Sequence, residues 1–199
     1  MAYAQPVHLR DYVDLSSQSD DNLLEDLIAR AQKIIEEHCG VSFEVTADTT
    51  RTFDVIRDVH KRVVHFDQWL AQITTVTNDA DAASPETVAA TQYITLPRNE
   101  GPYYGIELKQ SSTIVWTYDA DPADGIEITG RWGWSVTVPD DIRHWTIRLA
   151  VFLYRQRESS ADLDRPLLTA DGVTILPSQI PNDVLQGLRG YRQLTLMGA

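Results

Sequence analysis

The chain has few of the residues on which covalently stabilised or membrane-spanning proteins depend. Its 199 residues include a single cysteine, Cys39, so an intrachain disulfide and a cysteine zinc cluster are both excluded. No apolar run approaches the roughly 20 residues that cross a bilayer. The first residues show no basic region followed by an apolar one. We therefore expect neither a membrane partner nor a signal peptide.

Positive charge is also scarce. The chain has 17 Lys and Arg against 29 Asp and Glu, which gives a net charge of -12. Because phosphate neutralisation dominates the affinity of proteins for nucleic acids, this chain is not expected to grip DNA through its overall field. An acidic surface that lets DNA pass without adhering remains compatible with this charge, and simple solubility is the other explanation.

Catalytic and cofactor motifs are missing as well. Gly-x-Ser-x-Gly, Gly-x-x-x-x-Gly-Lys and Gly-x-Gly-x-x-Gly do not occur, and the five histidines form neither His-Glu-x-x-His nor His-x-His;. The carboxylate pairs Asp20/Asp21 and Asp140/Asp141 stand at predicted helix starts, where capping and the helix dipole explain them. The sequence therefore predicts no catalytic residue, no cofactor and no metal site.

Two long stretches have the apolar spacing of amphipathic helices. The first covers residues 20–38, with leucines and isoleucines recurring every three or four positions;. The second covers residues 140–157 and begins next to Pro139, which suits the first turn of a helix because its missing N–H costs nothing there. Together they predict a helical core formed by residues 19–40 and 138–157.

The chain between these helices, residues 41–137, has the pattern of β structure. Short β-prone runs are separated by polar, glycine or proline breaks, and they are Ser42–Val45, Arg51–Val55, Arg62–Phe66, Ile73–Thr77, Gln92–Leu96, Ile106–Lys109, Ile114–Tyr118 and Gly125–Gly130. The predicted fold class is α+β: a small helical bundle of two long helices and a short C-terminal helix, with an inserted antiparallel β-sheet or sandwich.

A glycine–tryptophan corner joins the last of these runs to the second helix. Its residues are predicted to be structural, because glycine allows backbone angles that bulkier residues resist and tryptophan favours core or interface positions. These residues are Gly130, Trp132, Gly133, Trp134 and Pro139.

The two ends of the chain are predicted to be arms. Residues 1–18 are mixed and polar and are expected to be extended, and residues 158–180, with two prolines and an Asp-Gly pair, form a loop or a hairpin-like arm;. Residues 181–199 contain a short helix and a tail. Its apolar face comprises Val184, Leu185, Leu188 and Tyr191. A helix of this length is marginal, so it needs a docking surface on its own chain or on a partner's.

Two further groups of residues are candidates for contact with a partner. Arg148, Arg155 and Arg157 share one helix and form either a solvated face or a basic strip for an acidic partner chain, since arginine is enriched at interfaces. The apolar residues Leu167, Leu168, Ile175 and Leu176 lie on an arm that is otherwise polar, where they suit a groove on a neighbour.

The order of these features resembles the head–tail connector (adaptor, head-completion) proteins of long-tailed bacteriophages. An amphipathic helix ends in Cys-Gly-Val-Ser-Phe, and a β region, Gly-Arg-Trp-Gly-Trp, Val-Pro-Asp-Asp-Ile and Leu-Tyr-Arg-Gln-Arg follow. The resemblance covers residues 15–157 and, more weakly, the terminal helix. The matching positions are Gly130, Gly133, Val138, Pro139, Ile142, Tyr154 and Arg157. The long β insertion and the 158–180 arm depart from the shorter members of that family.

The resemblance implies a structural virion protein without catalysis, assembled in the host cytoplasm and located in the neck of the particle. It implies a homo-oligomeric ring, typically a dodecamer, docked under the portal protein. Such a ring joins the portal to a downstream neck or tail-terminator protein and lines the channel through which genomic DNA passes without specific binding. We expect residues 158–199 to dock the portal and the β insertion to face the tail.

Two other classes of function remain open. One is another tail-completion or tail structural protein; tube subunits are chiefly β, so the two core helices argue against that form. The other is a carbohydrate-binding or hydrolytic domain that uses the carboxylates and a stacking platform of tryptophans, which are Trp69, Trp116, Trp132, Trp134 and Trp145. No pair of catalytic carboxylates is identifiable in the sequence, although such pairs are rarely adjacent along a chain.

Overall fold

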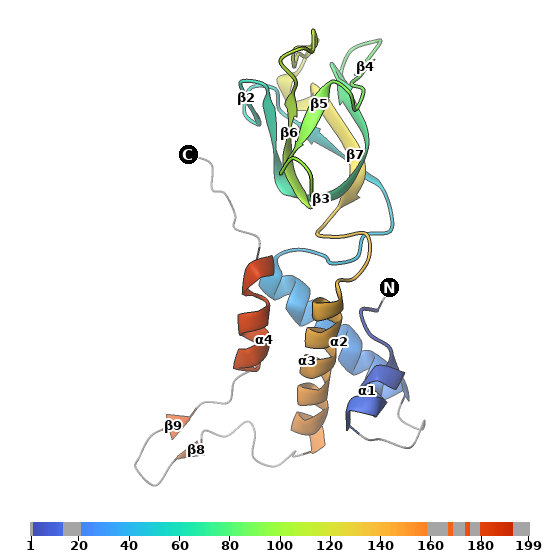
Figure 1. The fold of residues 1–199 in the computed structure, drawn as a ribbon, viewed down its shortest axis with the longest axis vertical. Coiled ribbons are helices and arrows are strands. Elements are labelled where there is room, and N and C mark those ends of the chain that lie inside the picture. The colour runs from blue at the N-terminus through green and yellow to red at the C-terminus, as the bar shows by residue number, and fades with distance from the viewer. Residues whose placement is uncertain (1, 14–20, 159–166, 169–173, 176–179, 193–199) are drawn as a thin grey trace. The chain divides into compact units, whose positions relative to one another are not determined.

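The computed structural model describes residues 2–13, 21–158, 167–168, 174–175 and 180–192 (Figure 1). The chain divides into a helical unit, which combines Met1–Gly40 with Val138–Arg192, and a β unit that covers Val41–Thr137. The helices and the antiparallel sheet confirm the predicted α+β fold class.

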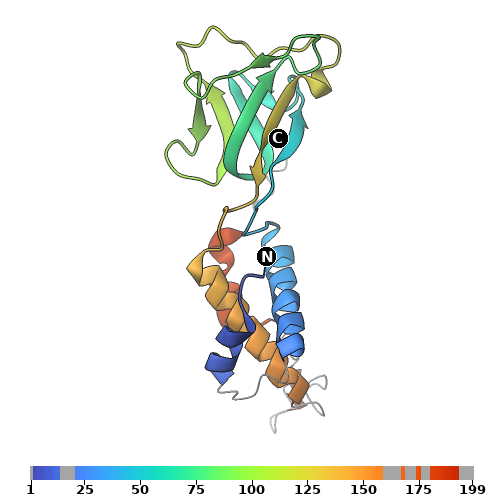
Figure 2. The ribbon, with the colours of Figure 1, turned by 90° about the vertical axis from the view of Figure 1, so that its right-hand side faces the viewer.

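The helical unit consists of four α-helices and a short 3-10 turn among the described residues. The helices are α1 (Pro6–Val13), α2 (Asp21–Cys39), α3 (Asp140–Glu158) and α4 (Asn182–Gly187), and the turn η2 covers Arg189–Tyr191. Helix α3 contacts each of the other three helices (Figures 1 and 2). It is therefore the central element of this unit.

Both long helices form where the sequence predicts them. In α2 the buried residues recur with helical spacing, and they are Leu24, Leu27, Ile28, Ala31, Ile35 and Cys39. Gly40 follows with φ of 72°, and its N–H donates to the Glu36 carbonyl at 2.8 Å, which ends the helix in a left-handed conformation. Asp20, expected at the start of this helix, lies outside the described residues.

The first residues of the chain are not extended as expected. Pro6 opens α1, where a proline is tolerated, and Leu9 is fully buried together with Tyr3 and Ala4. Arg10 also pairs with Asp21 at the start of α2, at 2.5 Å. An isolated eight-residue helix is unstable in water, so α1 depends on packing against α2 and α3 that no local pattern reveals.

The β unit is built on one antiparallel sheet. Its strands are β1 (Thr49–Phe53), β2 (Val59–His60), β3 (Val63–Asn78), β4 (Glu86–Thr87), β5 (Tyr93–Leu96), β6 (Tyr103–Leu108) and β7 (Ile126–Trp132). The strand order is β1-β7-β3-β6-β5, with β2 and β4 paired to the two ends of β3. A short 3-10 turn, η1 (Pro122–Asp124), precedes β7.

Strand β3 differs from its prediction, because two expected strands, Arg62–Phe66 and Ile73–Thr77, belong to one strand of 16 residues. Its first half pairs with β6 and its second half with β7. The pairing with β6 shifts register between His65 and Leu70. The polar residues between these two positions resemble the breaks that separate strands, so the sequence predicted two strands instead of one.

Two further expected strands are wrong. Ser42–Val45 and Ile114–Tyr118 have no strand structure, although Phe43, Ile114 and Trp116 are buried. Apolar residues in these segments fill the core without joining the ladder. Conversely, the stretch between the expected strands Ile73–Thr77 and Gln92–Leu96 contains β4, which pairs with the end of β3.

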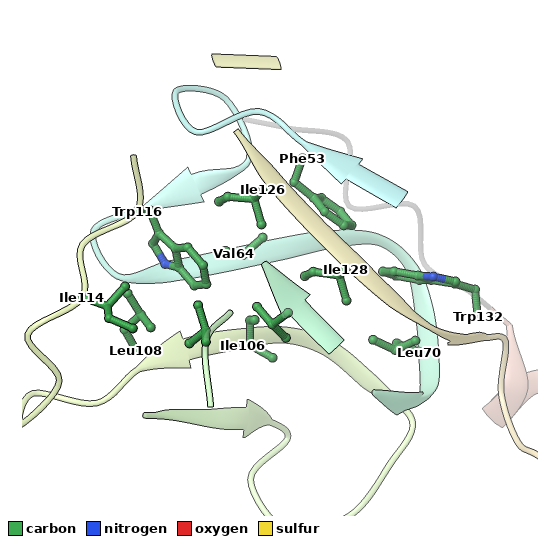
Figure 3. Close-up of a cluster of buried hydrophobic side chains, with 12 residues drawn as sticks. Phe53, Val64, Leu70, Ile106, Leu108, Ile114, Trp116, Ile126, Ile128 and Trp132 are labelled. Atoms are coloured by element: carbon green, nitrogen blue, oxygen red, sulfur yellow. The ribbon is translucent and has the colours of Figure 1, made fainter. Parts of the chain in front are cut away.

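The core of the β unit is formed by side chains that converge from several strands. Figure 3 shows residues of β1, β3, β6 and β7 pointing toward one another, with Ile114 and Trp116 from the segment that follows β6. Phe53, Phe66 and Trp132 form an aromatic cluster, with ring centroids 5.3–5.7 Å apart. Aromatic pairs at such distances contribute beyond the burial of their area.

Part of the predicted 158–180 arm is described. Leu167–Leu168 (β8) pairs antiparallel with Thr174–Ile175 (β9), which agrees with the hairpin-like alternative. The residues between and around these two short strands lie outside the described residues.

Candidate interaction surfaces

Helix α4 docks on α3 of its own chain. Val184 and Leu188 are fully buried there, and a Cβ built at Gly187 would lie 2.3 Å from two ring carbons of Trp145. Such a distance is shorter than any real contact, so only glycine permits this approach. Glycine generally weakens a helix, but here Gly187 is what lets α4 lie against the Trp145 ring.

Two polar contacts accompany this docking. Arg148 Nε donates to Asp183 Oδ2 at 3.0 Å, and the Tyr191 hydroxyl donates to Asp141 at the start of α3. Burial raises the pKa of Tyr191, and the hydrogen bond and negative charge of Asp141 raise it further. The tyrosine therefore remains a neutral donor, and it links η2 to the first turn of α3.

The structure buries some of the residues predicted to contact a partner and leaves others exposed. Val184 and Leu188 are enclosed within the helical unit, whereas Leu185 is half-buried and Arg155 is exposed. The apolar stripe of the terminal helix is thus covered largely by its own chain, which is one of the two alternatives that the sequence left open. The stripe does not need a partner to explain it.

The other candidates lie at or beyond the limit of what is described. Arg157 is part of α3, and Leu167, Leu168 and Ile175 lie in β8 and β9, but the structure does not describe their side chains. Leu176 lies outside the described residues.

The glycine–tryptophan corner is tightly packed within the β unit. A Cβ at Gly130 would lie 2.2 Å from the Gln72 carbonyl oxygen, and one at Gly133 would lie 2.3 Å from a Val45 methyl group. The Trp134 N–H donates to the Ser42 carbonyl at 2.8 Å. Neither glycine position has room for a side chain.

Pro139, in the helical unit, supplies the carbonyl that accepts the Arg143 N–H in the first turn of α3, at 3.0 Å.

Trp116 and Trp132 are core residues rather than an exposed platform. They are 6% and 5% exposed, and their indole N–H groups donate to the carbonyls of Arg62 and Thr49, each at 3.0 Å. The Arg51 guanidinium also lies 5.0 Å from the centroid of the Trp132 ring. A sugar cannot stack on rings buried in this way, so the carbohydrate-binding alternative loses two of its five candidate tryptophans.

An acidic group of loops surrounds Asp81 in the β unit. Its carboxylate accepts the backbone N–H groups of Asp119, Ala120 and Asp121 at 2.9, 2.6 and 2.8 Å. These bonds lower the pKa of Asp81 to about 2. Burial, followed by the charges of Asp81 and Asp119, raises the pKa of neighbouring Asp79. Asp81 therefore holds residues 119–121 in place, and its negative charge disfavours the ionised form of Asp79.

The single cysteine of the chain is buried. Burial raises the pKa of the Cys39 thiol to about 11, so it is a poor nucleophile near neutral pH. Among the described residues, no group of three or more His, Cys, Asp or Glu could hold a metal ion. In the part of the chain that the structure describes, no helix combines the length and apolar character needed to cross a bilayer.

A pocket of about 400 Å³ opens in the β unit between β5 and the middle of β3. It is lined by Ala71–Ile73, by Tyr93–Thr95, and by side chains of the β5–β6 connection, among them Arg98 and Asn99. Burial and the neighbouring Tyr103 raise the pKa of Tyr93, so this ring also stays neutral. We call this pocket the β5 seam.

Comparison with known proteins identifies the fold. No family model and no curated protein sequence matches the chain. Solved structures do match it. A chain in the neck of an empty GTA particle computed with C6 symmetry has a TM-score of 0.58 at 14% identity, over 98% of this chain and 91% of that chain.

Two other structures give the same result. A chain in the neck of a native GTA particle computed with C12 symmetry has a TM-score of 0.52 at 16% identity, over 97% of this chain and 90% of that one. A chain in the virion of a native gene transfer agent (GTA) particle has a TM-score of 0.51 at 16% identity, over 98% of this chain and 91% of that chain. The likeness extends over nearly the whole length of each chain, so it is a likeness of the complete fold and not of one unit.

Proposed function

We propose that this chain is a structural protein of the neck of a bacteriophage-like particle and has no catalytic activity. The observation that carries the proposal is the likeness, over nearly the full length of both chains, to proteins in the neck of GTA particles. The motif order that resembles phage head–tail connectors supports it independently, because that resemblance depends on residues and not on coordinates.

In this proposal the chain forms a closed ring, joins the portal to the next neck or tail protein and lines the DNA exit channel. The C12 symmetry of one neck particle supports twelve copies, since a closed ring fixes the copy number. The net charge of -12 suits a wall that DNA phosphates pass without adhering. The tail-completion alternative shares the virion location but not the copy number of a ring.

Quantitative mass spectrometry of purified particles tests this proposal, with copies counted against the major capsid protein. About twelve copies per particle are expected for a connector ring. Hundreds of copies would indicate a tube or decoration protein, and absence from the particle would remove the structural proposal altogether.

The orientation of the ring is a separate part of the proposal. We propose that the helical unit, with Arg155 and the 158–199 region, faces the portal and that the β unit faces the tail. Deletion of residues 181–199 is a poor test, because it removes Val184 and Leu188 from the core of the helical unit.

Charge reversal at exposed positions is a better test of orientation. Arg155→Glu on α3 should weaken attachment to portal-containing heads, whereas Arg57→Glu makes the same charge change in the β unit, at a side chain that is 85% exposed, and should leave attachment intact. If both variants attached to heads as well as the unsubstituted protein does, the proposed orientation would be contradicted. If both lost attachment to the same extent, the loss would not be specific to the helical unit, and the orientation would have no support.

A further inference from the structure

The residues that line the β5 seam show that the edge of β5 faces it. In a regular strand, side chains of successive residues point to opposite faces. Tyr93–Thr95 nevertheless line the seam together, which indicates that the seam meets the backbone edge of β5. Ala71–Ile73 of β3 also line the seam, but the register of β3 shifts between Leu70 and Gln72 and again between Ile73 and Thr75, so the pairing of β3, and not alternation, must define that side.

The register of β5 identifies the backbone groups at its edge. Ile94 is paired with Glu107 of β6, and the neighbouring Gln92 carbonyl accepts the Lys109 N–H at 2.8 Å. In an antiparallel pair, alternate residues direct their N–H and C=O toward the partner strand. Tyr93 and Thr95 therefore direct theirs away from β6, and within the described chain β5 has no strand on that side.

The facing edge of β3 is open over the same interval. Its pairing with β6 ends at Leu70, opposite Tyr103, and its pairing with β4 begins at Thr77. Among the described residues no strand pairs with Ala71–Thr75 on the side opposite β7. Unpaired edges of this kind are templates for another extended chain.

The side chains around the seam indicate what kind of chain fits. Tyr93 and Tyr103 supply aromatic surface, and Arg98 supplies a positive charge. No carboxylate lines the seam, although the chain has 29 acidic residues. The pocket volume of about 400 Å³ also lies within the range of roughly 300–1,000 Å³ that is typical of binding pockets.

We propose that the β5 seam binds an extended peptide segment that carries an acidic side chain. The peptide adds as a strand along β5 through the outward N–H and C=O groups of Tyr93 and Thr95, and its carboxylate pairs with Arg98. In this mode the main-chain hydrogen bonds supply affinity and the side-chain contacts supply specificity. The proposal does not depend on ring formation, because a single copy contains the whole site.

Binding of two synthetic peptides to the full-length chain tests the proposal. The probes are labelled Thr-Val-Thr-Val-Glu-Val-Thr and the same peptide with Lys in place of Glu, measured by fluorescence anisotropy. A hydrogen bond between charged groups is stronger than a neutral one, so the Glu peptide should bind about tenfold more tightly than the Lys peptide. Failure of the folded chain to bind the Glu peptide would overturn the proposal.

Four variants, two tests each with its control, separate the two halves of the interaction. Arg98→Gln should abolish the preference for the Glu peptide, while Arg57→Gln removes a charge elsewhere and should preserve it. Thr95→Pro removes an outward N–H and should abolish binding of both peptides. Thr95→Ala is its matched control, because it loses only the hydroxyl that donates to the Arg98 carbonyl at 3.1 Å and keeps the N–H.

Several outcomes would contradict strand addition. Undiminished binding to Thr95→Pro, with the β unit shown to be folded by its amide NMR spectrum, would exclude it. If Thr95→Pro does not fold, the unsubstituted chain decides: the amide NMR signals of Tyr93 and Thr95 should shift when the Glu peptide binds, and unchanged signals would exclude strand addition. Displacement of the peptide by a mixture of oligosaccharides would instead indicate a sugar site. None of these results bears on the copy number that tests the neck proposal.

Discussion

Gly187 of α4 lies directly against the indole ring of Trp145 in α3, at a distance that leaves no space for a Cβ atom. Val184 and Leu188, on either side of this glycine, are buried in the core of the helical unit. The close contact is therefore part of what docks the terminal helix on α3.

Replacement of Gly187 by alanine should destabilise this docking. A Cβ only 2.3 Å from the Trp145 ring forces the short helix outward, and overpacking of this kind costs about 1–3 kcal/mol. The gain in helix propensity, about 1 kcal/mol, offsets part of that cost. Faster hydrogen exchange of the α4 amides, with a lower midpoint of thermal unfolding, is the expected result.

Gly190 provides the matched control, because nothing lies within 4 Å of a Cβ built there. Gly190→Ala should change the free energy of unfolding by no more than about 0.5 kcal/mol. If both variants exchanged their α4 amides at the rate of the unsubstituted protein, the close contact with Trp145 would be wrong.

Gly130→Ala should destabilise the β unit. Its Cβ would lie 2.2 Å from the Gln72 carbonyl oxygen, so β7 and β3 must separate locally. The expected loss is about 1–3 kcal/mol, measured by urea unfolding. Gly101→Ala is the comparison, since its nearest neighbours are 3.6 Å away and its stability should be nearly unchanged. Equal stability of the two variants would contradict the close approach of β3 and β7.

Cys39 should react slowly with thiol reagents in the folded protein. Burial raises its pKa from 9.0 to about 11, a difference that lowers the thiolate fraction near neutral pH about 100-fold. The stability that the buried thiol contributes is present below pH 9.0 and is lost as the pH rises toward about 11;. Alkylation rates with and without denaturant measure the effect. Equal rates would show that the thiol is accessible, and Cys39→Ser serves as the unlabelled control.

The Asp81 carboxylate should titrate well below an ordinary aspartate. Three backbone N–H groups lower its pKa from 3.8 to about 2, so its contribution to stability is present above pH 3.8 and is lost as the pH falls toward 2;. NMR titration of the side-chain carboxyl measures the pKa directly. Asp81→Asn should also speed amide exchange at Asp119–Asp121.

Asp124→Asn removes the same charge nearby without removing these hydrogen bonds. It should leave exchange at Asp119–Asp121 unchanged. An Asp81 carboxyl that titrates at the ordinary value of 3.8 would show that the three bonds do not form.

The long helices α2 and α3 could be predicted because each is 19 residues long. Over that length a period of 3.6 residues is unmistakable. Helix α1 could not be predicted, because its eight residues are held by the burial of Leu9 and not by local propensity. The polar middle of β3 was misleading for a related reason: a register shift lets one strand serve two partners, and this depends on neighbours distant in sequence.

The candidate sites, like the helices and strands, could be predicted only in part. The sequence singled out the terminal helix and its apolar face, but not that Trp145 receives Gly187. It gave no indication of the β5 seam, because strand edges are defined only once every pairing is known. Arg98 is visible in the sequence as a single cation, but it acquires a meaning only beside the open edges of β3 and β5.

The sequence by itself determined the charge of the chain, its lack of disulfide chemistry, its two long helices and its α+β class. These depend on composition and on periodicities that span a few turns or strands. Only the tertiary structure decided what covers the terminal helix, why Gly130 and Gly187 must be glycines, and where strand edges remain unpaired. An apolar face shows that a segment must be covered, but the covering residues come from distant parts of the chain, so only the folded molecule defines them.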